Sequence, residues 1–371
     1  MVINDAKVYR LEEPVESVVR TAFGSMTKRT ALLLSLRDQD GAVGWGESWV
    51  NFPAWAAAER QIAFAQAYLP YLKGRRVAEI PAFIQTMARA FMGPAQQAAA
   101  TGPLVQALCA VEIALWDLQA QRAGQSLAQL LFRKPAPGVP VYASGINSPL
   151  PWARIDQQLH QGVRLFKLKL GFGRRQDRAN LRNLQRHLGS AAGIAVDVNR
   201  GWTLEEARSW LGELKDLGVA WLEEPLRVEQ ESQLGTLRRH GVKIAAGENI
   251  IFDPTAGSQS QPVLAGVDIL QPDITKNCGL QQSVDLLGNL RRGQRLYPHF
   301  LGSAVGQAAS IQLATGCGPE TWLEWDINAN PLRTDLTHRP FEIQDGRLAV
   351  PDIPGLGWQV DEKRLQKFLV R

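Results

Sequence analysis

Three carboxylates follow one another along the chain at almost equal intervals. Asp197, Glu223 and Glu248 lie 26 and 25 residues apart, each at the end of a short apolar run. If each run is one strand of a parallel sheet, the three carboxylates meet at one point, where they repel unless a hard cation neutralises them. An all-oxygen set suits Mg²⁺, whereas Zn²⁺ prefers histidine or cysteine. One such acid alone would more simply cap a helix or make a surface ion pair, but the set predicts a magnesium site.

Two lysines share one face of the stretch RLFKLKLGFG, residues 164–173. Alternation along a strand puts Phe166 and Leu168 on one face and Lys167 and Lys169 on the other. On an edge strand both ammonium groups would simply face water, but the surrounding pattern indicates a strand covered on both faces. Like charge and a nearby dication are expected to lower the lysine pKa values. One lysine can then act as a neutral base, while the other stays positive and binds an anionic oxygen.

A carboxylate and an imidazole end two further apolar runs. Asp273 follows DILQP, and His299 lies in LYPHFLG. A carboxylate that orients an imidazole makes it a positioned acid or base. Glu324, in ETWLEWD, could donate a hydrogen bond to a developing oxyanion if neighbouring acids keep it protonated. The remaining histidines fall in helical or tail contexts that indicate surface positions: His160, His187, His240 and His338.

The elements that carry these residues recur with a regular rhythm from about residue 139. The apolar segments are PVYASG, VRLFKLKLG, GIAVDVN, VAWLEEP, VKIAAGEN, GVDILQPD, QRLYPHF and ETWLEWD. Helical patterns such as TLEEARSWLGELKDLG separate most of them. Repeated strand–helix units predict a TIM-like α/β barrel of the (β/α)7β type, whose chemistry lies at the C-terminal ends of the strands. Helix capping alone does not explain why successive strands all end at ionisable residues.

The chain before the barrel has a different pattern. The stretch RTALLLSLRDQDGAVGWGES predicts a hairpin, and alanine-rich helical stretches such as ALCAVEIALWDLQAQRAG follow it. A run of strands followed by helices indicates a separate α+β unit. We therefore expect a capping domain over residues 1–125 and the barrel over 126–326. A C-terminal tail over 327–371 is expected to pack back on the capping domain.

Composition narrows the class of protein further. Of 371 residues, 45% are hydrophobic and 21% charged, which is ample for a core. The net charge of +5 is scattered without a basic block, so a nucleic-acid partner is not expected, whereas a small anionic substrate is. The three cysteines show no metal or disulfide spacing and indicate a reducing compartment. No signal-like start and no membrane-spanning apolar run is evident, so the expected location is cytoplasmic.

The order of the motifs resembles a known family. Lys-x-Lys, Asp197-x-Asn199, WLEEP, GEN, PD with a following lysine, PH and LEWD succeed one another along the barrel, and EIALWDL lies in the capping domain. This order is similar to that of the enolase superfamily, mandelate racemase subgroup, over essentially the whole chain. The resemblance implies the barrel with a capping domain, a bound Mg²⁺ and a homo-oligomer.

The resemblance also implies a role for each matched residue. Asp197, Glu223 and Glu248 would hold Mg²⁺. The other implied roles are Lys169 as base on one face, the His299–Asp273 dyad on the other, Lys167 against the substrate carboxylate, Glu324 as electrophilic acid and Asn199 as a substrate contact. Muconate-lactonizing and dipeptide-epimerase relatives would carry a catalytic lysine where this chain has Asp273, and Lys276 resembles a structural position. This departure favours the racemase and acid-sugar dehydratase side.

The implied chemistry is removal of the proton α to a carboxylate, with an enediolate intermediate. Loss of a β-hydroxyl, assisted by His299, dehydrates an aldonate or aldarate to a 2-keto-3-deoxy acid, which is the favoured outcome. Reprotonation from the opposite face would instead racemise or epimerise a 2-hydroxy acid. A metal-dependent barrel hydrolase would need more histidines at its strand ends, and a non-catalytic carboxylate-binding relative would have lost part of the acid/base set.

Substrate choice is expected to depend on two loops of the capping domain. RTAFGSMTKR and ESWVNFPAW offer apolar side chains for a lid and polar ones for hydroxyls or a second carboxylate. The expected lid residues are Phe23, Met26, Phe52 and Trp55, and the expected polar residues are Arg20, Lys28, Arg29 and Asn51. A packing or surface role is the simpler interpretation for each of these residues taken alone, because loops carry both roles.

Overall fold

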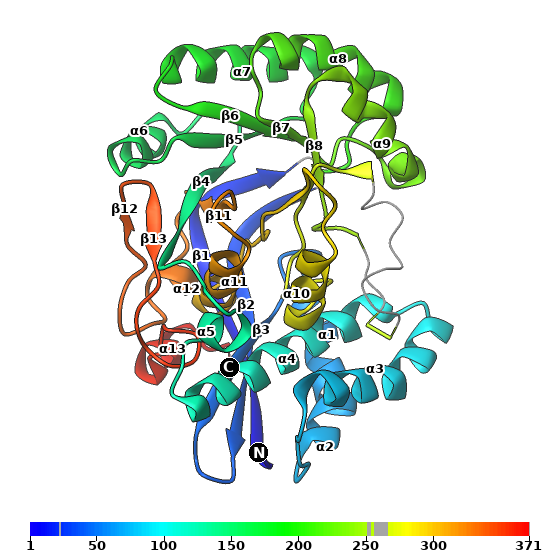
Figure 1. Ribbon diagram of the computed structural model, residues 1–371, viewed down its shortest axis with the longest axis vertical. Coiled ribbons are helices and arrows are strands. Elements are labelled where there is room, and N and C mark those ends of the chain that lie inside the picture. Colours follow the sequence, from blue (N-terminus) through cyan, green and yellow to red (C-terminus); the bar gives the residue numbers. More distant parts are fainter. Residues whose placement is uncertain (22–23, 251–253, 256–265, 371) are drawn as a thin grey trace.

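A computed structural model describes residues 1–21, 24–250, 254–255 and 266–370 (Figure 1). An antiparallel sheet with its helices occupies one end of the molecule, and the strands of a parallel barrel occupy the other. Phe23 and the segments 251–253 and 256–265 lie outside the described residues.

The N-terminal sheet contains the hairpin that the sequence predicts. Its strands are β1 (Ile3–Thr21), β2 (Gly24–Asp38) and β3 (Val43–Ser48), paired in the order β1-β2-β3. Gly41 has a φ of 87°, the left-handed conformation that the tight β2–β3 turn needs. Gly46 allows a helix to lie against β3, since a Cβ there would collide with the Ala110 carbonyl. This contact brings the end of β3 toward the barrel.

The helices between the N-terminal sheet and the barrel follow the alanine-rich stretches. They are α1 (Ala56–Ala63), a π-helical turn (Phe64–Tyr68), α2 (Leu69–Leu72), α3 (Ile80–Gln97), α4 (Thr101–Ala123) and α5 (Leu127–Leu131). The α4 helix ends at Gly124, with a φ of 65°. By length and composition alone α4 could cross a membrane, contrary to expectation, but 72% of its most apolar window is buried within the protein. It is therefore a core helix between the sheet and the barrel.

The barrel confirms the fold predicted from the eight apolar segments. Its strands are β4 (Gly138–Ile146), β5 (Leu165–Lys169), β6 (Gly193–Asp197), β7 (Trp221–Glu223), β8 (Lys243–Ala246), β9 (Ile269–Leu270), β10 (Arg295–Leu296) and β11 (Leu323–Asp326). Successive strands from β4 to β10 pair in parallel, and β11 returns to pair with β4. All C-terminal strand ends therefore open on the same face.

Helices cover the outside of this barrel (Figure 1). They are α6 (Trp152–His160), α7 (Arg174–Leu188), α8 (Leu204–Asp216), α9 (Leu234–Leu237) with a 3-10 turn on each side, α10 (Leu280–Gly288) and α11 (Ala304–Gly316). Thr203 and Glu206 form a capping box that starts α8. Inside the barrel Tyr142, Trp221 and Tyr297 pack edge to face, which closes its interior below the strand ends.

The C-terminal tail touches both parts of the molecule. Its elements are α12 (Pro331–Thr334), β12 (Ile343–Gln344), β13 (Arg347–Ala349) and α13 (Glu362–Phe368). The β12–β13 hairpin pairs antiparallel with the start of β4, while α13 packs on β1 and Val370 N donates to the Arg10 carbonyl at 2.9 Å. The tail thus joins the N-terminal sheet to the barrel.

Buried acids of the first domain cap helices of the barrel. The Glu47 carboxylate, at the end of β3, accepts from Ser303 N at 2.8 Å, Ser303 Oγ at 2.6 Å and Gly306 N at 2.7 Å, at the start of α11. Glu112 on α4 accepts from Gln281 N at 2.7 Å, at the start of α10. Anions at helix N-termini are stabilised by the free N–H groups there. These contacts fix the first domain over the strand ends.

Candidate active site

The predicted acids and bases lie together at the C-terminal ends of the barrel strands. These residues are almost completely buried, and none is more than 8% exposed: Lys167, Lys169, Asp197, Glu223, Glu248, Asp273, His299 and Glu324. Buried charges persist only when they are paired and hydrogen-bonded. The pairings therefore define what the site can do.

Lys167 lies at the centre of a carboxylate cluster. Its Nζ is 2.5 Å from Glu223 Oε1, 2.7 Å from Glu324 Oε1 and 3.6 Å from Asp197 Oδ2. Burial opposes the charged form of Lys167, but these carboxylates outweigh burial and hold its pKa well above the ordinary value. Burial raises the pKa of Glu223 to about 8, and the nearby acids Asp197 and Glu324 add to the rise. Three carboxyl groups thus share this one ammonium group.

Lys169 pairs with the first predicted metal ligand. Its Nζ is 2.5 Å from Asp197 Oδ2 and donates to Asn199 Oδ1 at 2.8 Å. Burial lowers the pKa of this lysine, but the carboxylates of Asp197, Glu248 and Glu223 together outweigh burial, and the net direction is upward. The sequence-based expectation of a lowered pKa assumed a dication among the carboxylates. With the carboxylates paired to the lysines instead, both lysine pKa values are raised.

Asn199 joins two of the carboxylates. Its Nδ2 lies 3.4 Å from Asp197 Oδ2 and 3.3 Å from Glu248 Oε1. The residue has a φ of 47°, and Arg200 and Glu224 are also left-handed, with φ of 60° and 39°. Left-handed non-glycine residues are strained and persist where the surrounding structure holds them, often at functional sites. Here they follow directly after the strands that end at Asp197 and Glu223.

His299 forms the dyad that the sequence predicts. Its Nδ1 is 2.9 Å from Asp273 Oδ2, and its Nε2 is 2.7 Å from Glu248 Oε2. Asp273 is itself held by Thr275, whose Oγ1 donates to Oδ1 at 2.6 Å. Burial lowers the pKa of His299, but Glu248 and Glu324 outweigh burial and hold it well above the usual range. The imidazolium form, an acid, is thus favoured here.

The donor set of the three strand-end carboxylates suits a hard divalent cation. Asp197, Glu223 and Glu248 offer six carboxylate oxygens, and Glu223 is fixed by Trp221 Nε1 at 3.0 Å and Gln271 Nε2 at 2.7 Å. Among the residues that the structure describes, no group of three His, Cys, Asp or Glu side chains converges closely enough to hold a metal ion as they stand. Lysine and histidine nitrogens lie against these oxygens instead. Hence the ligand types and charges fit Mg²⁺, and binding requires the carboxylates to exchange those partners.

A cavity of about 140 Å³ opens beside this cluster. It is lined by Met26, Arg29, Trp49, Asn51, Phe52, Gly145, Asn147, Lys169, Asn199, Glu248, Asn249, Lys276, His299, Leu301, Asp326 and Asn328. Side chains of β2 and of the segment after β3 form one wall, and strand-end residues form the rest. Five of the lining side chains are asparagines, so the wall is rich in amide donors and acceptors.

Both halves of the chain match models of one family. Residues 5–131 match the mandelate racemase / muconate lactonizing enzyme N-terminal domain, and residues 153–364 match the enolase C-terminal domain-like model. The chain belongs to the mandelate racemase / muconate lactonizing enzyme family. The family expected from the motif order is thereby confirmed, and the protein is an enzyme of the mandelate racemase type.

Relatives of this family match along nearly the whole chain. A D-galactarolactone cycloisomerase of Agrobacterium fabrum is 27% identical, covering 99% of each chain. An L-talarate/galactarate dehydratase of Salmonella typhimurium is 27% identical, covering 91% of this chain and 82% of its own. A solved mandelate racemase/muconate lactonizing enzyme of Bordetella bronchiseptica RB50 is 31% identical with a TM-score of 0.86, covering 99% of each chain.

Some of the expected lid residues line the cavity, and others do not. Phe52 lines the cavity, and Met26, Arg29 and Asn51 do so as well. Trp55 lies apart from the cavity: it is 64% exposed, and its Nε1 donates to Glu59 at 3.1 Å. Phe23 lies outside the described residues. The two loops therefore contribute both residues that line the cavity and residues that lie on the surface.

Several cavity residues were not predicted from the sequence. Lys276 donates to Asn249 Oδ1 at 2.6 Å, lies 3.7 Å from Glu248 Oε2, and packs its ammonium 4.6 Å from the centre of the Trp49 ring. Asn147, Asn249 and Asn328 were also missed. Each asparagine comes one to three residues after a strand end, which is the one local signal that would have identified it.

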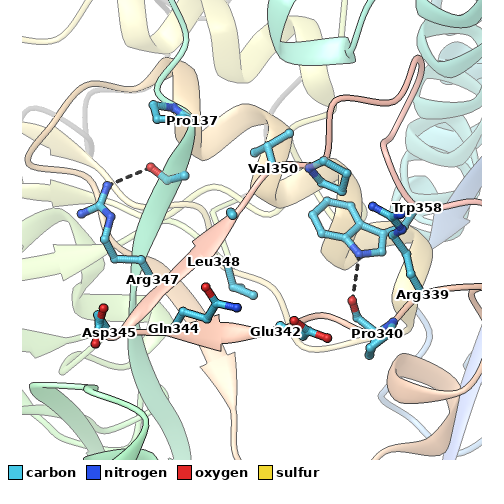
Figure 2. Close-up of a pocket in the computed structure, with 13 residues that line it drawn as sticks. Pro137, Arg339, Pro340, Glu342, Gln344, Asp345, Arg347, Leu348, Val350 and Trp358 are labelled. Atoms are coloured by element: carbon cyan, nitrogen blue, oxygen red, sulfur yellow. Dashed lines mark hydrogen bonds between the residues drawn. The ribbon is translucent and has the colours of Figure 1, made fainter.

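A second cavity, of about 720 Å³, is larger. Its lining residues, drawn in Figure 2, include none of the acid/base cluster. The β12–β13 hairpin and the start of β4 form this cavity, at the N-terminal end of that barrel strand. Arg347 donates to the Gly138 carbonyl at 2.9 Å, and Trp358 Nε1 donates to the Pro340 carbonyl at 3.4 Å (Figure 2). Barrel chemistry belongs to the opposite ends of the strands, so we place the active site in the smaller cavity.

Proposed function

We propose that this enzyme dehydrates an acid sugar, an aldonate or aldarate, to a 2-keto-3-deoxy acid with the help of Mg²⁺. The observation that carries the proposal is the placement of Lys169 and His299. Both line the same cavity, from the ends of β5 and β10, which are not neighbours in the barrel. A substrate between them presents its α-carbon to the amine and its β-substituent to the imidazole.

The metal site in this proposal is Asp197, Glu223 and Glu248. When bound there, Mg²⁺ supplies a positive charge that stabilises negative charge developing on the substrate carboxylate. The support comes from the chemistry of the donor set, the three carboxyl groups that share Lys167 and the membership of the family.

The chain's own side chains then perform the proton transfers. Asp197 holds the pKa of Lys169 up, so Lys169 becomes a neutral amine only when Asp197 exchanges it for another partner. In that form Lys169 takes the α-proton, while Lys167 and Glu324, whose Nζ and Oε1 lie 2.7 Å apart, hold the carboxylate of the enediolate. The electron pair of the enediolate expels the β-hydroxyl as His299 gives it a proton, so water leaves. The resulting enol takes a proton at the β-carbon, gives up its hydroxyl proton and becomes the 2-keto-3-deoxy acid. Asp273 orients His299 for this step.

The wall of the cavity supports a hydroxylated substrate. Five asparagine side chains lie in the wall, and amides are suited to the hydroxyls of a sugar chain. The matched relatives include enzymes named for acid sugars: the L-talarate/galactarate dehydratase and, at 25% identity over 72% of this chain, an arabinonate dehydratase of Saccharolobus solfataricus.

An isomerase is the second candidate. One relative that matches over nearly its whole length is named as a cycloisomerase. A racemase or epimerase of a 2-hydroxy acid would use the same two-sided site, with Lys169 and His299 exchanging the α-proton from opposite faces. A relative that binds carboxylates without catalysis is the remote alternative, and the intact acid/base set argues against it.

Proton exchange in D₂O separates these candidates. Wild-type protein with Mg²⁺ and a panel of aldonic, aldaric and 2-hydroxy acids should form a 2-keto acid. Lys169→Met should abolish both product and α-proton exchange, whereas His299→Asn should stop hydroxyl loss and still permit exchange, because the enediolate forms without the leaving-group acid. In a racemase, each variant should instead exchange the α-proton of one enantiomer only. Full turnover in both variants would refute the two-sided site.

The remaining expectations belong to the same proposal. We propose a cytoplasmic enzyme, supported by three cysteines that are all free thiols. Residues 1–125 would form the specificity domain, with residues 327–371 packed against it, supported by the contacts of α13 and Val370 with β1. A homo-oligomer is supported by the family resemblance alone.

A further inference from the structure

A buried pair of arginines shares one carboxylate beside the active-site cavity. Arg29 on β2 is 5% exposed, Arg333 on α12 is 5% exposed, and Asp326 at the end of β11 is 4% exposed. Arg29 Nη2 donates to Asp326 Oδ2 at 2.8 Å. The negative charge of Asp326 also acts on Arg333, over a longer distance. The Nε of Arg333 has no hydrogen-bond partner among the described residues. Two buried cations thus face one buried anion.

This cluster keeps an uncompensated positive charge. Asp326 Oδ1 is already used by Asn328, which donates from its N at 2.9 Å and from its Nδ2 at 2.8 Å. Within the described part of the chain, Asp326 is the only acid that makes an ion pair with Arg29. Burial lowers the pKa of Arg333 to about 10, and Arg29 adds to the fall. An unpaired charge in a dry environment is costly unless an anion meets it.

Arg29 presents that charge to the cavity. It lines the cavity, and its Nη1 has the Met26 Sδ at 3.7 Å as its acceptor, while its Nε reaches the Ala329 carbonyl at a long 3.4 Å. A thioether is a weak acceptor, so Nη1 keeps most of its capacity for an oxygen. A guanidinium is well suited to a planar carboxylate.

Other cations near the cavity have partners of their own. Lys28 ion-pairs with Glu12 at 2.6 Å and does not line the cavity. Lys276 is bound to Asn249 and lies beside Glu248, among the proposed metal ligands. Arg29 is therefore the cation placed to meet a second anionic group of a substrate whose first carboxylate lies at Lys167.

We infer that Arg29 binds the distal carboxylate of a dicarboxylic substrate, so that the enzyme selects aldarates over aldonates. This inference rests on the proposed function, because it takes the reacting carboxylate to lie at the strand-end acids. Asp326 and Arg333 act as positioning residues: Asp326 fixes the guanidinium, and Arg333 offsets part of the negative charge of Asp326.

Matched pairs of acids test the inference directly. Each of several aldarates is compared with the aldonate of the same configuration, with Mg²⁺ present, by calorimetric binding and by 2-keto acid formation. Wild-type protein should bind its best aldarate at least 30-fold more tightly than the matched aldonate. Arg29→Gln should reduce that ratio to within about 3-fold, and Arg29→Lys should restore part of it.

Two further variants keep the outcome clear. Arg29→Gln leaves Asp326 without its ion-pair partner. The double variant Arg29→Gln/Asp326→Asn removes both charges, so it should fold, and it should also lose the preference for the aldarate over the matched aldonate. Arg154→Gln is the matched control, because Arg154 donates to Asn328 Oδ1 at 2.9 Å but does not line the cavity; it should keep the ratio. An equal affinity of wild type for both acids, or a ratio that survives without Arg29, would overturn the inference. Arg29-dependent binding of aldarates without 2-keto acid formation would uphold it and refute the dehydratase.

Discussion

At the scale of single residues, the site is a set of opposite charges in mutual contact. Lys167 and Lys169 each sit 2.5 Å from a carboxylate that we propose as a metal ligand, and His299 sits 2.7 Å from the third. Each nitrogen therefore occupies a place that a divalent cation would compete for. Charge balance, more than shape, governs which partner each carboxylate takes.

Removal of one proposed ligand should abolish metal binding. Glu223→Ala loses one of three carboxylates while Asp197 and Glu248 remain, so the Mg²⁺ affinity should fall by at least 100-fold and activity should fall with it. Titration calorimetry with Mg²⁺ measures the affinity directly, and EDTA treatment of wild type should remove activity too. Glu205→Gln, an exposed position on α8, is the control. Unchanged Mg²⁺ affinity in Glu223→Ala, or full activity after EDTA, would exclude this site.

At the scale of elements, the buried acids of the first domain hold two barrel helices. Glu47 caps α11, whose preceding loop carries His299, and Trp49 N donates to the Thr275 carbonyl at 3.0 Å, next to Asp273. The segment after β3 thus contacts both loops of the dyad. Burial raises the pKa of Glu47 to about 7, and the negative charge of Asp273 adds to the rise.

This raised pKa predicts a pH dependence of stability. Glu47 takes up its proton at about pH 7 when folded and at 4.5 when unfolded, so the unfolded chain binds fewer protons between these values. The contribution of Glu47 to the free energy of unfolding is therefore lost as pH rises from 4.5 to 7, by about 3 kcal/mol. Glu47→Gln cannot titrate, so the free energy of unfolding of wild type minus that of the variant should fall over this window.

Urea unfolding at pH 5, 6, 7 and 8 measures this difference. Glu205→Gln, which removes an exposed carboxylate, should give a difference that is flat with pH. A flat difference for Glu47→Gln as well would mean that Glu47 is ionised throughout, and that its three hydrogen bonds outweigh its burial.

At the scale of the whole molecule, the sheet domain and the barrel share buried polar contacts. Arg29 with Asp326, Glu47 with Ser303 and Glu112 with Gln281 all cross between them. Either part alone would leave buried charges without partners, which costs several kcal/mol per charge. The two parts are therefore expected to unfold together.

Calorimetry should show one cooperative thermal transition, with equal calorimetric and van't Hoff enthalpies for one protomer. Glu112→Gln should lower the transition temperature without splitting the transition, since α10 loses its cap while the other contacts remain. Two resolved transitions in the wild type would show that the shared contacts are weaker than the cores of the separate parts.

The pattern of the sequence predicts the barrel, which the structure confirms, and it predicts which strand-end residues form the proposed site. Strand periodicity and strand-end position are local, so all eight strands and the residues from Lys167 to Glu324 could be located without the tertiary structure. Which side chains pair with one another depends on the tertiary structure. Arg29 and Asp326 are 297 residues apart and Glu47 and Ser303 256 apart, and no local pattern encodes contacts that depend on how two domains dock. Docking also left Trp55 outside the cavity and set the direction of the lysine pKa values, because both follow from which groups lie nearby in space.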